Sequence, residues 1–182
     1  MQQQIAISGA GLVGSLLACY LAKRQYKVSV YERRSDSRKS GYAGGRSINL
    51  ALSNRGWAAL ENIGLKKEIE SIALPMSGRI IHHLSGEKVF QPYGKEGQAI
   101  YSVSRGILNE TLMDAAEKAG VSFHFNQHCI DVNFENTEAI FENTQSKAIT
   151  KILPEVLLAA EGAYSEVRYK MQRTHNFNIS QQ

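Results

Sequence analysis

Three glycines near the start of the chain have the spacing of a phosphate-binding turn. Gly9, Gly11 and Gly14 lie in the segment GAGLVG, directly after the apolar run 4–8. In such a turn the first glycine permits the tight bend, the second lets a pyrophosphate approach the backbone, and the third lets helix and strand pack closely. The N–H groups and the positive dipole end of the following helix favour the same anion. The pattern predicts a dinucleotide site; the alternative is a glycine-rich turn in an ordinary α/β domain.

An acidic residue at the end of the second expected strand bears on which dinucleotide binds. Glu32 closes the run 27–32, where a carboxylate can accept hydrogen bonds from an adenosine ribose. Because a carboxylate there repels a 2′-phosphate, the sequence favours FAD or NAD over NADP at this turn. Four basic residues follow and could neutralise a phosphate, although we interpret the last two as part of a solvated loop: Arg33, Arg34, Arg38 and Lys39.

The chain around the turn has the pattern of strands and helices that would position it. A short apolar run followed by glycine, as in 4–8, is typical of a buried parallel strand. A segment with apolar and small residues on nearly every face, as in 12–25, is typical of a helix that packs against a sheet. The segment SGE at 85–87 predicts a hairpin, and the polar tail after Arg168 shows no element. The expected strands cover 4–8, 27–32, 79–84, 88–93, 100–103, 121–125, 129–134, 139–141 and 156–160, and the expected helices cover 12–25, 53 or 54 to 63, and 105–119.

Composition excludes several classes of protein. The 182 residues are 43% hydrophobic and 21% charged, and 21 Lys and Arg against 17 Asp and Glu give a net charge of +4. These values are typical of a globular core, and the basic residues form no long stripe of the kind that nucleic-acid binding needs. Cys19 and Cys129 form no CxxC motif and no disulfide framework. The uncharged run 5–22 could suggest a membrane span or a signal peptide, but glycines break it and no positively charged segment precedes it. We therefore expect a cytoplasmic protein with no nucleic-acid partner and no membrane span.

Two histidines and a cysteine lie close together after the third expected helix. His124 and His128 would share a face on one strand, with Cys129 adjacent. Because no third ligand stands at a convincing spacing, we predict no metal site, and no Ser-His-Asp or Cys-His catalytic set is indicated.

One longer stretch resembles a known family. The segment GRSINLALS at 45–53 is similar to the loop after the second strand in kynurenine 3-monooxygenases, which are class A FAD-dependent aromatic hydroxylases. Shorter matches extend the similarity over nearly the whole chain, among them SVSR at 102–105 and GAYS at 162–165. The resemblance implies an α/β, FAD/NAD(P)-binding, Rossmann-like three-layer fold of the glutathione-reductase type, with additional antiparallel hairpins.

The resemblance also implies functional residues. Arg79 and Tyr93 match the family's kynurenine contacts, and a guanidinium with a phenol can bind the α-carboxylate of L-kynurenine. A three-residue loop over 85–87 would place Arg79 directly opposite Tyr93, whereas a two-residue loop would put them on opposite faces. The alternative for Arg79 is a surface charge on a strand. The residues expected to bind FAD, from the glycine turn and from the resemblance together, are Gly9, Gly11, Val13, Gly14, Tyr31, Glu32, Arg33, Arg34, Ala51, Arg105 and Cys129.

The activity implied by the resemblance is hydroxylation of L-kynurenine to 3-hydroxykynurenine, with FAD as cofactor and NADPH and O2 as co-substrates. We assign no catalytic residue, because the cofactor carries this chemistry. Two features depart from the family: Glu161 stands where its motif Asp-Gly-x-x-Ser-x-x-Arg begins, and the chain is much shorter. We expect one FAD-binding domain over 1–182, as a fragment that includes the start (about 75–103) of the substrate-binding sheet. The alternatives are another FAD- or NAD(P)-dependent oxidoreductase of this fold and a non-catalytic truncated flavin-binding domain.

Overall fold

The computed structural model describes residues 3–40, 49–95 and 97–174. The chain divides into two compact units, the first comprising 1–43 with 109–182 and the second comprising 44–108. Helix α5 (Arg105–Lys118) begins in the second unit, and its residues from Asn109 onward belong to the first.

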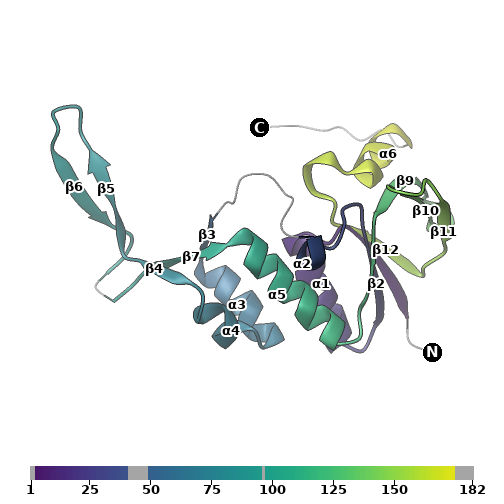
Figure 1. Ribbon diagram of the computed structural model, residues 1–182, viewed down its shortest axis with the longest axis horizontal. Coiled ribbons are helices and arrows are strands. Elements are labelled where there is room, and N and C mark those ends of the chain that lie inside the picture. Colours follow the sequence, from purple (N-terminus) through teal and green to yellow (C-terminus); the bar gives the residue numbers. More distant parts are fainter. Residues whose placement is uncertain (1–2, 41–48, 96, 175–182) are drawn as a thin grey trace. The chain divides into compact units, whose positions relative to one another are not determined.

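The first unit is built on a four-stranded parallel sheet that includes β2 and β12 (Figure 1). Its strand order is β12-β1-β2-β8. Its register sets Ile7 between Val30 and Leu158, so these three side chains share one face. Ile7 and Val30 are fully buried, as expected for parallel strands covered on both sides. The strands are β1 (Gln4–Ser8), β2 (Lys27–Glu32), β8 (Ser122–Phe125) and β12 (Val156–Ala159).

Helices α1 (Leu12–Lys23) and α5 lie together on one side of this sheet (Figure 1). The buried Cys19 thiol of α1 donates to the Leu112 carbonyl of α5 at 3.3 Å, so the two helices are in direct contact. Buried Leu112, Met113 and Ala116 give α5 its apolar side. The one-turn helix α2 (Ser37–Ser40) follows β2.

A second, antiparallel sheet covers the opposite side and completes three layers (Figure 1). It consists of β9 (Gln127–Asn133), β10 (Glu138–Asn143) and β11 (Ile149–Ile152) in the order β11-β10-β9. Tyr31 and Leu157 of the parallel sheet pack against a core cluster formed by Cys129, Val132, Ala139 and Phe141 of this second sheet together with Val167.

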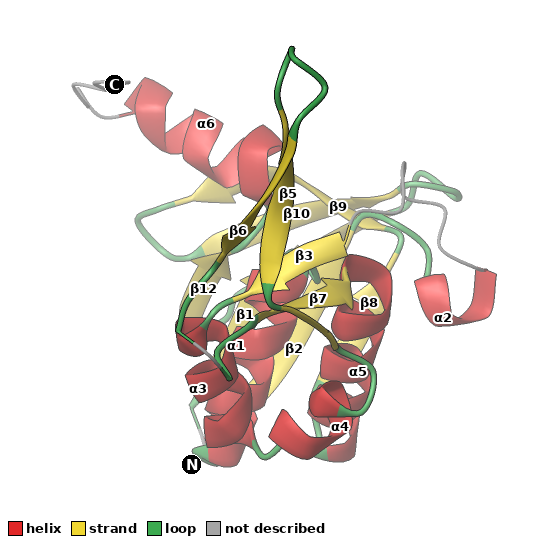
Figure 2. Cartoon of the chain, turned by 90° about the vertical axis from the view of Figure 1, so that its left-hand side faces the viewer, coloured by secondary structure: helices red, strands yellow, loops and turns green. Residues whose placement is uncertain are grey.

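The second unit contains a three-stranded antiparallel sheet in the order β3-β7-β4 and a two-stranded hairpin (Figure 2). Its buried apolar residues include Leu60, Leu65, Ile69 and Val103. Helix α3 ends at Gly64, whose φ of 84° is the left-handed conformation that glycine adopts readily. The elements are β3 (Asn49–Leu52), α3 (Asn54–Ile63), α4 (Lys66–Glu70), β4 (Leu74–Met76), β5 (Gly78–His82), β6 (Lys88–Pro92) and β7 (Ile100–Ser104).

The expectation that no element follows Arg168 is wrong. After the short 3-10 turn η1 (Gly162–Tyr164), helix α6 (Glu166–Thr174) packs on β9. A single apolar residue, Val167, enters the core cluster, so the polar sequence hid the buried side of the helix. Sequence analysis also missed α2, β3, α4, β4 and β11, which are short elements of three to five residues.

A helix that crosses a bilayer needs about 20 mostly apolar residues. Within 3–40, 49–95 and 97–174, no helix is both long enough and apolar enough to do so. The uncharged run 5–22 contributes the strand β1 and most of α1 instead of one continuous helix.

Candidate functional site

The glycine turn joins the carboxyl end of β1 to α1, and its glycines meet different surroundings. A Cβ atom on Gly9 would lie 2.6 Å from the Ala160 carbonyl oxygen, and one on Gly14 would lie 1.9 Å from the Gly9 carbonyl oxygen. A Cβ atom on Gly11 would meet nothing within 4 Å. The fold therefore requires glycine at the first and third positions, while the open space beside Gly11 lets a ligand approach the backbone.

The start of α1 supplies donors to the same open space. The first hydrogen bond of the helix runs from the Ser15 N–H to the Gly11 carbonyl at 2.9 Å, so the N–H groups before it have no acceptor within the helix. No acidic residue lies in the first turn, and the Val13 side chain is 69% exposed. This end of the helix is therefore suited to an anion.

Glu32 links the end of β2 to the glycine turn. One carboxylate oxygen accepts from the Ala10 N–H at 2.8 Å, and the other accepts from the Arg34 N–H at 3.0 Å. Each oxygen of a carboxylate can accept more than one hydrogen bond, so both can still accept from a ribose hydroxyl. Arg33 and Arg34 are exposed directly after it.

Arg38 lies in an ion-pair network, which corrects its interpretation as part of a solvated loop. Its guanidinium contacts Asp36 at 2.8 Å, Asp114 at 2.7 Å and Glu117 at 2.6 Å, and its side chain is only 16% exposed. The hydrogen bond from Arg38 is the main cause that lowers the pKa of Asp36. Because three carboxylates already surround this guanidinium, it does not serve to neutralise a ligand phosphate. Lys39 is exposed, as expected.

Tyr31 stacks between two other rings beside Glu32. The centre of its ring lies 4.6 Å from the centre of the His124 ring and 4.5 Å from that of the Phe141 ring, and burial raises the pKa of the phenol.

The two histidines that were expected on one strand lie on different strands, His124 on β8 and His128 on β9. Asn126, with a φ of 58°, separates the two strands. Among the described residues, no three His, Cys, Asp or Glu side chains are placed to hold a metal.

Cys129 belongs to the core of the first unit. Its side chain is 2% exposed, and burial raises the pKa of the thiol to about 12, with the nearby Glu161 carboxylate as a smaller cause. The thiol is therefore protonated and inert at neutral pH. A contact between Cys129 and FAD stays a prediction, and it would have to be made by the backbone.

Glu161, the departure from the family motif, accepts three hydrogen bonds inside the fold. Its carboxylate accepts from the Ser8 hydroxyl at 2.6 Å, the Ser165 hydroxyl at 2.7 Å and the Val167 N–H at 3.2 Å. It thereby joins the end of β1 to the first turn of α6. Sequence analysis singled out this position but missed this role, because Ser8 is 153 positions away.

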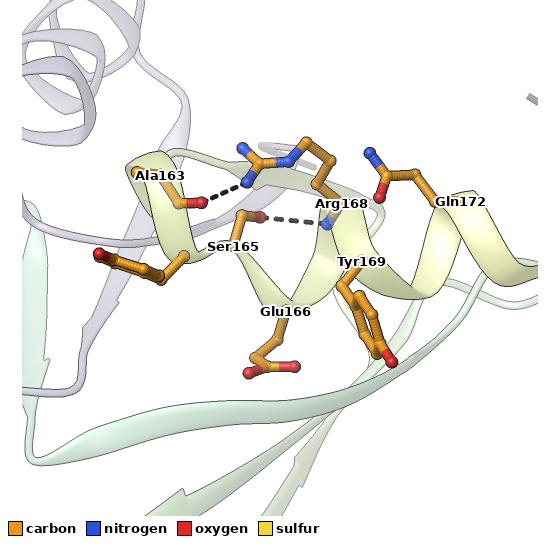
Figure 3. A pocket seen from close by; sticks show the side chains of 7 residues that line it. Ala163, Ser165, Glu166, Arg168, Tyr169 and Gln172 are labelled. Atoms are coloured by element: carbon orange, nitrogen blue, oxygen red, sulfur yellow. Dashed lines mark hydrogen bonds between the residues drawn. The ribbon is translucent and has the colours of Figure 1, made fainter. Parts of the chain in front are cut away.

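Arg168, the last residue of the same motif, holds the turn η1. Its guanidinium donates to the Gly162 carbonyl at 2.9 Å and to the Ala163 carbonyl. The open hollow of about 310 Å³ beside it is lined by Arg168, Gln172, Glu166, Tyr169 and three residues of 163–165. Figure 3 shows Arg168 and Gln172 pointing to one side of α6 and Glu166 and Tyr169 to the other. These polar groups do not converge, so the hollow has no arrangement for one ligand.

The predicted pairing of Arg79 with Tyr93 is wrong, because the register of the hairpin differs by two residues from the expected one. Arg79 is paired with Gln91 and donates to its side-chain oxygen at 2.8 Å, whereas the Tyr93 N–H donates to the Ser77 carbonyl. Residues 84–86 form the loop, because Gly86 adopts a φ of 87° and its N–H donates to the His83 carbonyl. The shift of two residues leaves Tyr93 diagonal to Arg79, at a position of the same face.

The expected cofactor residues are divided between the two units. Ala51 and Arg105 are exposed and belong to the second unit. Arg79 and Tyr93 belong to the same unit. Residues 45–48 of the GRSINLALS segment lie outside the described residues. The first unit brings together the glycine turn, Val13, Tyr31, Glu32, Arg33 and Arg34 at the carboxyl ends of β1 and β2, which is where open α/β sheets bind ligands.

Known proteins match this chain along nearly its whole length. A family model described as FAD binding domain matches residues 2–178. The kynurenine 3-monooxygenase of Christiangramia forsetii is 46% identical over 181 residues, which make up 99% of this chain and 40% of that protein. The kynurenine 3-monooxygenase of Sus scrofa is 46% identical over 179 residues, or 98% of this chain and 38% of that protein. The chain thus spans about two fifths of the length of these relatives.

Solved structures share the fold at low sequence identity. The flavin-dependent monooxygenase PieE, in complex with FAD and substrate, matches with a TM-score of 0.80 and 14% identity over 94% of this chain and 32% of PieE. The p-nitrophenol 4-monooxygenase PnpA from Pseudomonas putida DLL-E4 matches with a TM-score of 0.76 and 19% identity over 93% of this chain and 43% of PnpA. These matches confirm the predicted α/β fold with a parallel sheet and antiparallel hairpins.

Proposed function

The chain belongs to the FAD binding domain family, and we propose that it holds FAD at its glycine turn as part of an enzyme that hydroxylates L-kynurenine. The observation that carries the cofactor proposal is the open space beside Gly11, next to the N–H groups that begin α1 and have no acceptor within that helix. The likeness to kynurenine 3-monooxygenases supports the substrate.

The residues of the first unit fit the adenosine diphosphate half of FAD. The pyrophosphate would meet Gly11 and the first turn of α1, where backbone donors and the helix dipole favour negative charge. The Glu32 carboxylate, already held by the Ala10 and Arg34 N–H groups, would accept hydrogen bonds from the ribose. Since Arg38 is engaged by three carboxylates, the site offers less to a 2′-phosphate, which favours FAD over NADP here.

When bound, FAD supplies the oxygen-transfer chemistry, with NADPH as the source of electrons and O2 as the oxidant. The described residues contribute binding and orientation, and we assign none of them a proton-transfer role. Arg79 and Tyr93 remain the proposed contacts for the kynurenine carboxylate. Their diagonal placement on the hairpin lets a guanidinium and a phenol act on the same side.

We also propose a cytoplasmic location. Cys19 and Cys129 are both free and buried, and neither is used in a disulfide. A chain of this kind suits a reducing compartment. Detection of the protein in an oxidising compartment, with these two cysteines modified, would contradict this proposal.

Titration of the 182-residue chain with FAD, ADP and NADP tests the cofactor proposal. We expect FAD and ADP to bind and NADP to bind more weakly, with all binding lost in Gly11→Val. NADP bound more tightly than FAD at this site would refute the assignment and favour a nicotinamide-dependent oxidoreductase. Formation of 3-hydroxykynurenine from L-kynurenine, NADPH and O2 by an enzyme that contains this chain tests the substrate. Its absence despite bound flavin would favour a flavin oxidoreductase with a different substrate, or a flavin-binding domain without catalytic activity.

A further inference from the structure

Two side chains from different helices hold the carbonyl group at the centre of the glycine turn. The Ala10 carbonyl oxygen accepts from the Ser15 hydroxyl at 3.1 Å and from the Asn109 side-chain nitrogen at 3.0 Å. Ser15 lies on α1 and is fully buried, and Asn109 lies on α5, 99 positions from Ala10. Both residues belong to the first unit.

These hydrogen bonds fix the direction of the next N–H group. A peptide unit is planar and trans, so its carbonyl and its N–H point in opposite directions. Holding the Ala10 carbonyl toward Ser15 and Asn109 therefore directs the Gly11 N–H away from them. The preceding peptide is also fixed, because the Ala10 N–H donates to Glu32 at 2.8 Å. The Gly11 residue borders open space, where a Cβ atom would meet nothing within 4 Å.

The remaining polar atom of the Asn109 amide argues against a purely structural role. Its side-chain oxygen is buried and has no hydrogen-bond partner among the described residues. A buried acceptor without a partner costs stability, so an apolar residue of similar size would serve the fold at least as well. The Ala10 carbonyl would still accept from Ser15 if Asn109 were replaced.

We propose that Asn109 is a positioning residue for the pyrophosphate of the dinucleotide, acting through the Ala10–Gly11 peptide. This inference rests on the proposed function, since it concerns the same ligand. Asn109 does not touch the ligand in this proposal. It holds the peptide so that the Gly11 N–H is already directed at the phosphate, which reduces the ordering required when the ligand binds.

The test is Asn109→Leu in the 182-residue chain, with Asn54→Leu as the matched control. Asn54 is an exposed asparagine at the start of α3 in the second unit. We expect Asn109→Leu to keep the wild-type melting temperature. We expect its affinities for ADP and for FAD to fall by the same factor, about 5- to 30-fold, which is the scale of one oriented hydrogen bond. The control should bind both ligands as the wild type does.

The amide signal of Gly11 in NMR spectra provides a readout that a stability defect would not reproduce. In the wild type we expect ADP to shift this signal strongly, and in Asn109→Leu we expect a reduced shift even at saturating ADP. Unchanged affinity, a lowered melting temperature or failure of Asn109→Leu to fold would each overturn the proposal. If the wild type binds neither ADP nor FAD, the proposed function itself fails, which is a separate outcome.

Discussion

The clearest prediction compares alanine at the second and third glycines of the turn. In Gly14→Ala the new Cβ would lie 1.9 Å from the Gly9 carbonyl oxygen, so the backbone would have to shift by more than about 1 Å to restore van der Waals contact. Gly9 cannot move freely, because its N–H donates to the Tyr31 carbonyl at 2.7 Å and its φ is 104°. Overpacking typically costs about 1–3 kcal/mol, and a clash with fixed backbone belongs at the upper end or beyond it. We expect the free energy of unfolding to fall by at least about 3 kcal/mol.

Gly11→Ala should have the opposite profile. Gly11 has a φ of −72° and a ψ of −177°, which any residue adopts, and its Cβ would enter open space. Alanine is a poorer helix N-cap than glycine by several tenths of a kcal/mol, and the loss of glycine's freedom in the unfolded chain offsets about 0.4–1 kcal/mol. The free energy of unfolding should therefore stay within about 0.5 kcal/mol of wild type. The new methyl group would occupy the space proposed for the pyrophosphate, so FAD affinity should fall by at least about tenfold.

Urea unfolding and FAD titration of both variants measure these two quantities. The reasoning requires the two effects to separate, with stability lost in Gly14→Ala and affinity lost in Gly11→Ala. A stable Gly14→Ala variant would show that α1 is not packed against the turn as described. A Gly11→Ala variant that binds FAD with wild-type affinity would show that the ligand does not approach this backbone.

Three further predictions concern contacts outside the glycine turn. Glu161→Ala removes the acceptor of three hydrogen bonds and should lower the free energy of unfolding by about 2–3 kcal/mol in urea; an unchanged value would show that α6 is held by other contacts. The Arg38 guanidinium lowers the pKa of Asp36, so this contribution to stability is present above the ordinary aspartate pKa and is lost as the pH falls through the lowered value. The difference in free energy of unfolding between wild type and Arg38→Met should therefore be smaller below about pH 4 than at pH 7. An equally large difference in acid would contradict this reasoning. In an enzyme that contains this chain, Arg79→Ala should weaken the binding of L-kynurenine by about 30-fold or more with FAD content unchanged, and Gln91→Ala serves as the control. If Arg79→Ala binds L-kynurenine as tightly as the wild type does, Arg79 is a surface charge.

Local sequence determined the elements around the glycine turn. The strands expected over 4–8 and 27–32 have these bounds in the structure, and α1 begins at Leu12 as expected. These elements were predictable because each depends on neighbours in the chain: an apolar run, the glycine spacing and a terminal acid. The same holds for α3, whose end at Gly64 follows from one residue in a left-handed conformation.

Tertiary structure decided the features that depend on residues far apart in the chain. Helix α6 has a polar sequence, and its contacts with the rest of the unit are made by residues far away in the chain. Its Val167 side chain is buried in the core cluster, and its Lys170 forms an ion pair with Asp131 of β9 at 2.7 Å. Glu161 accepts both from the Val167 N–H and from Ser8 of β1. The contact of Asn109 with Ala10 requires α5 to lie against the turn, which no spacing in the sequence specifies. Such contacts form only when the layers pack, because each partner alone gives no local preference for the other.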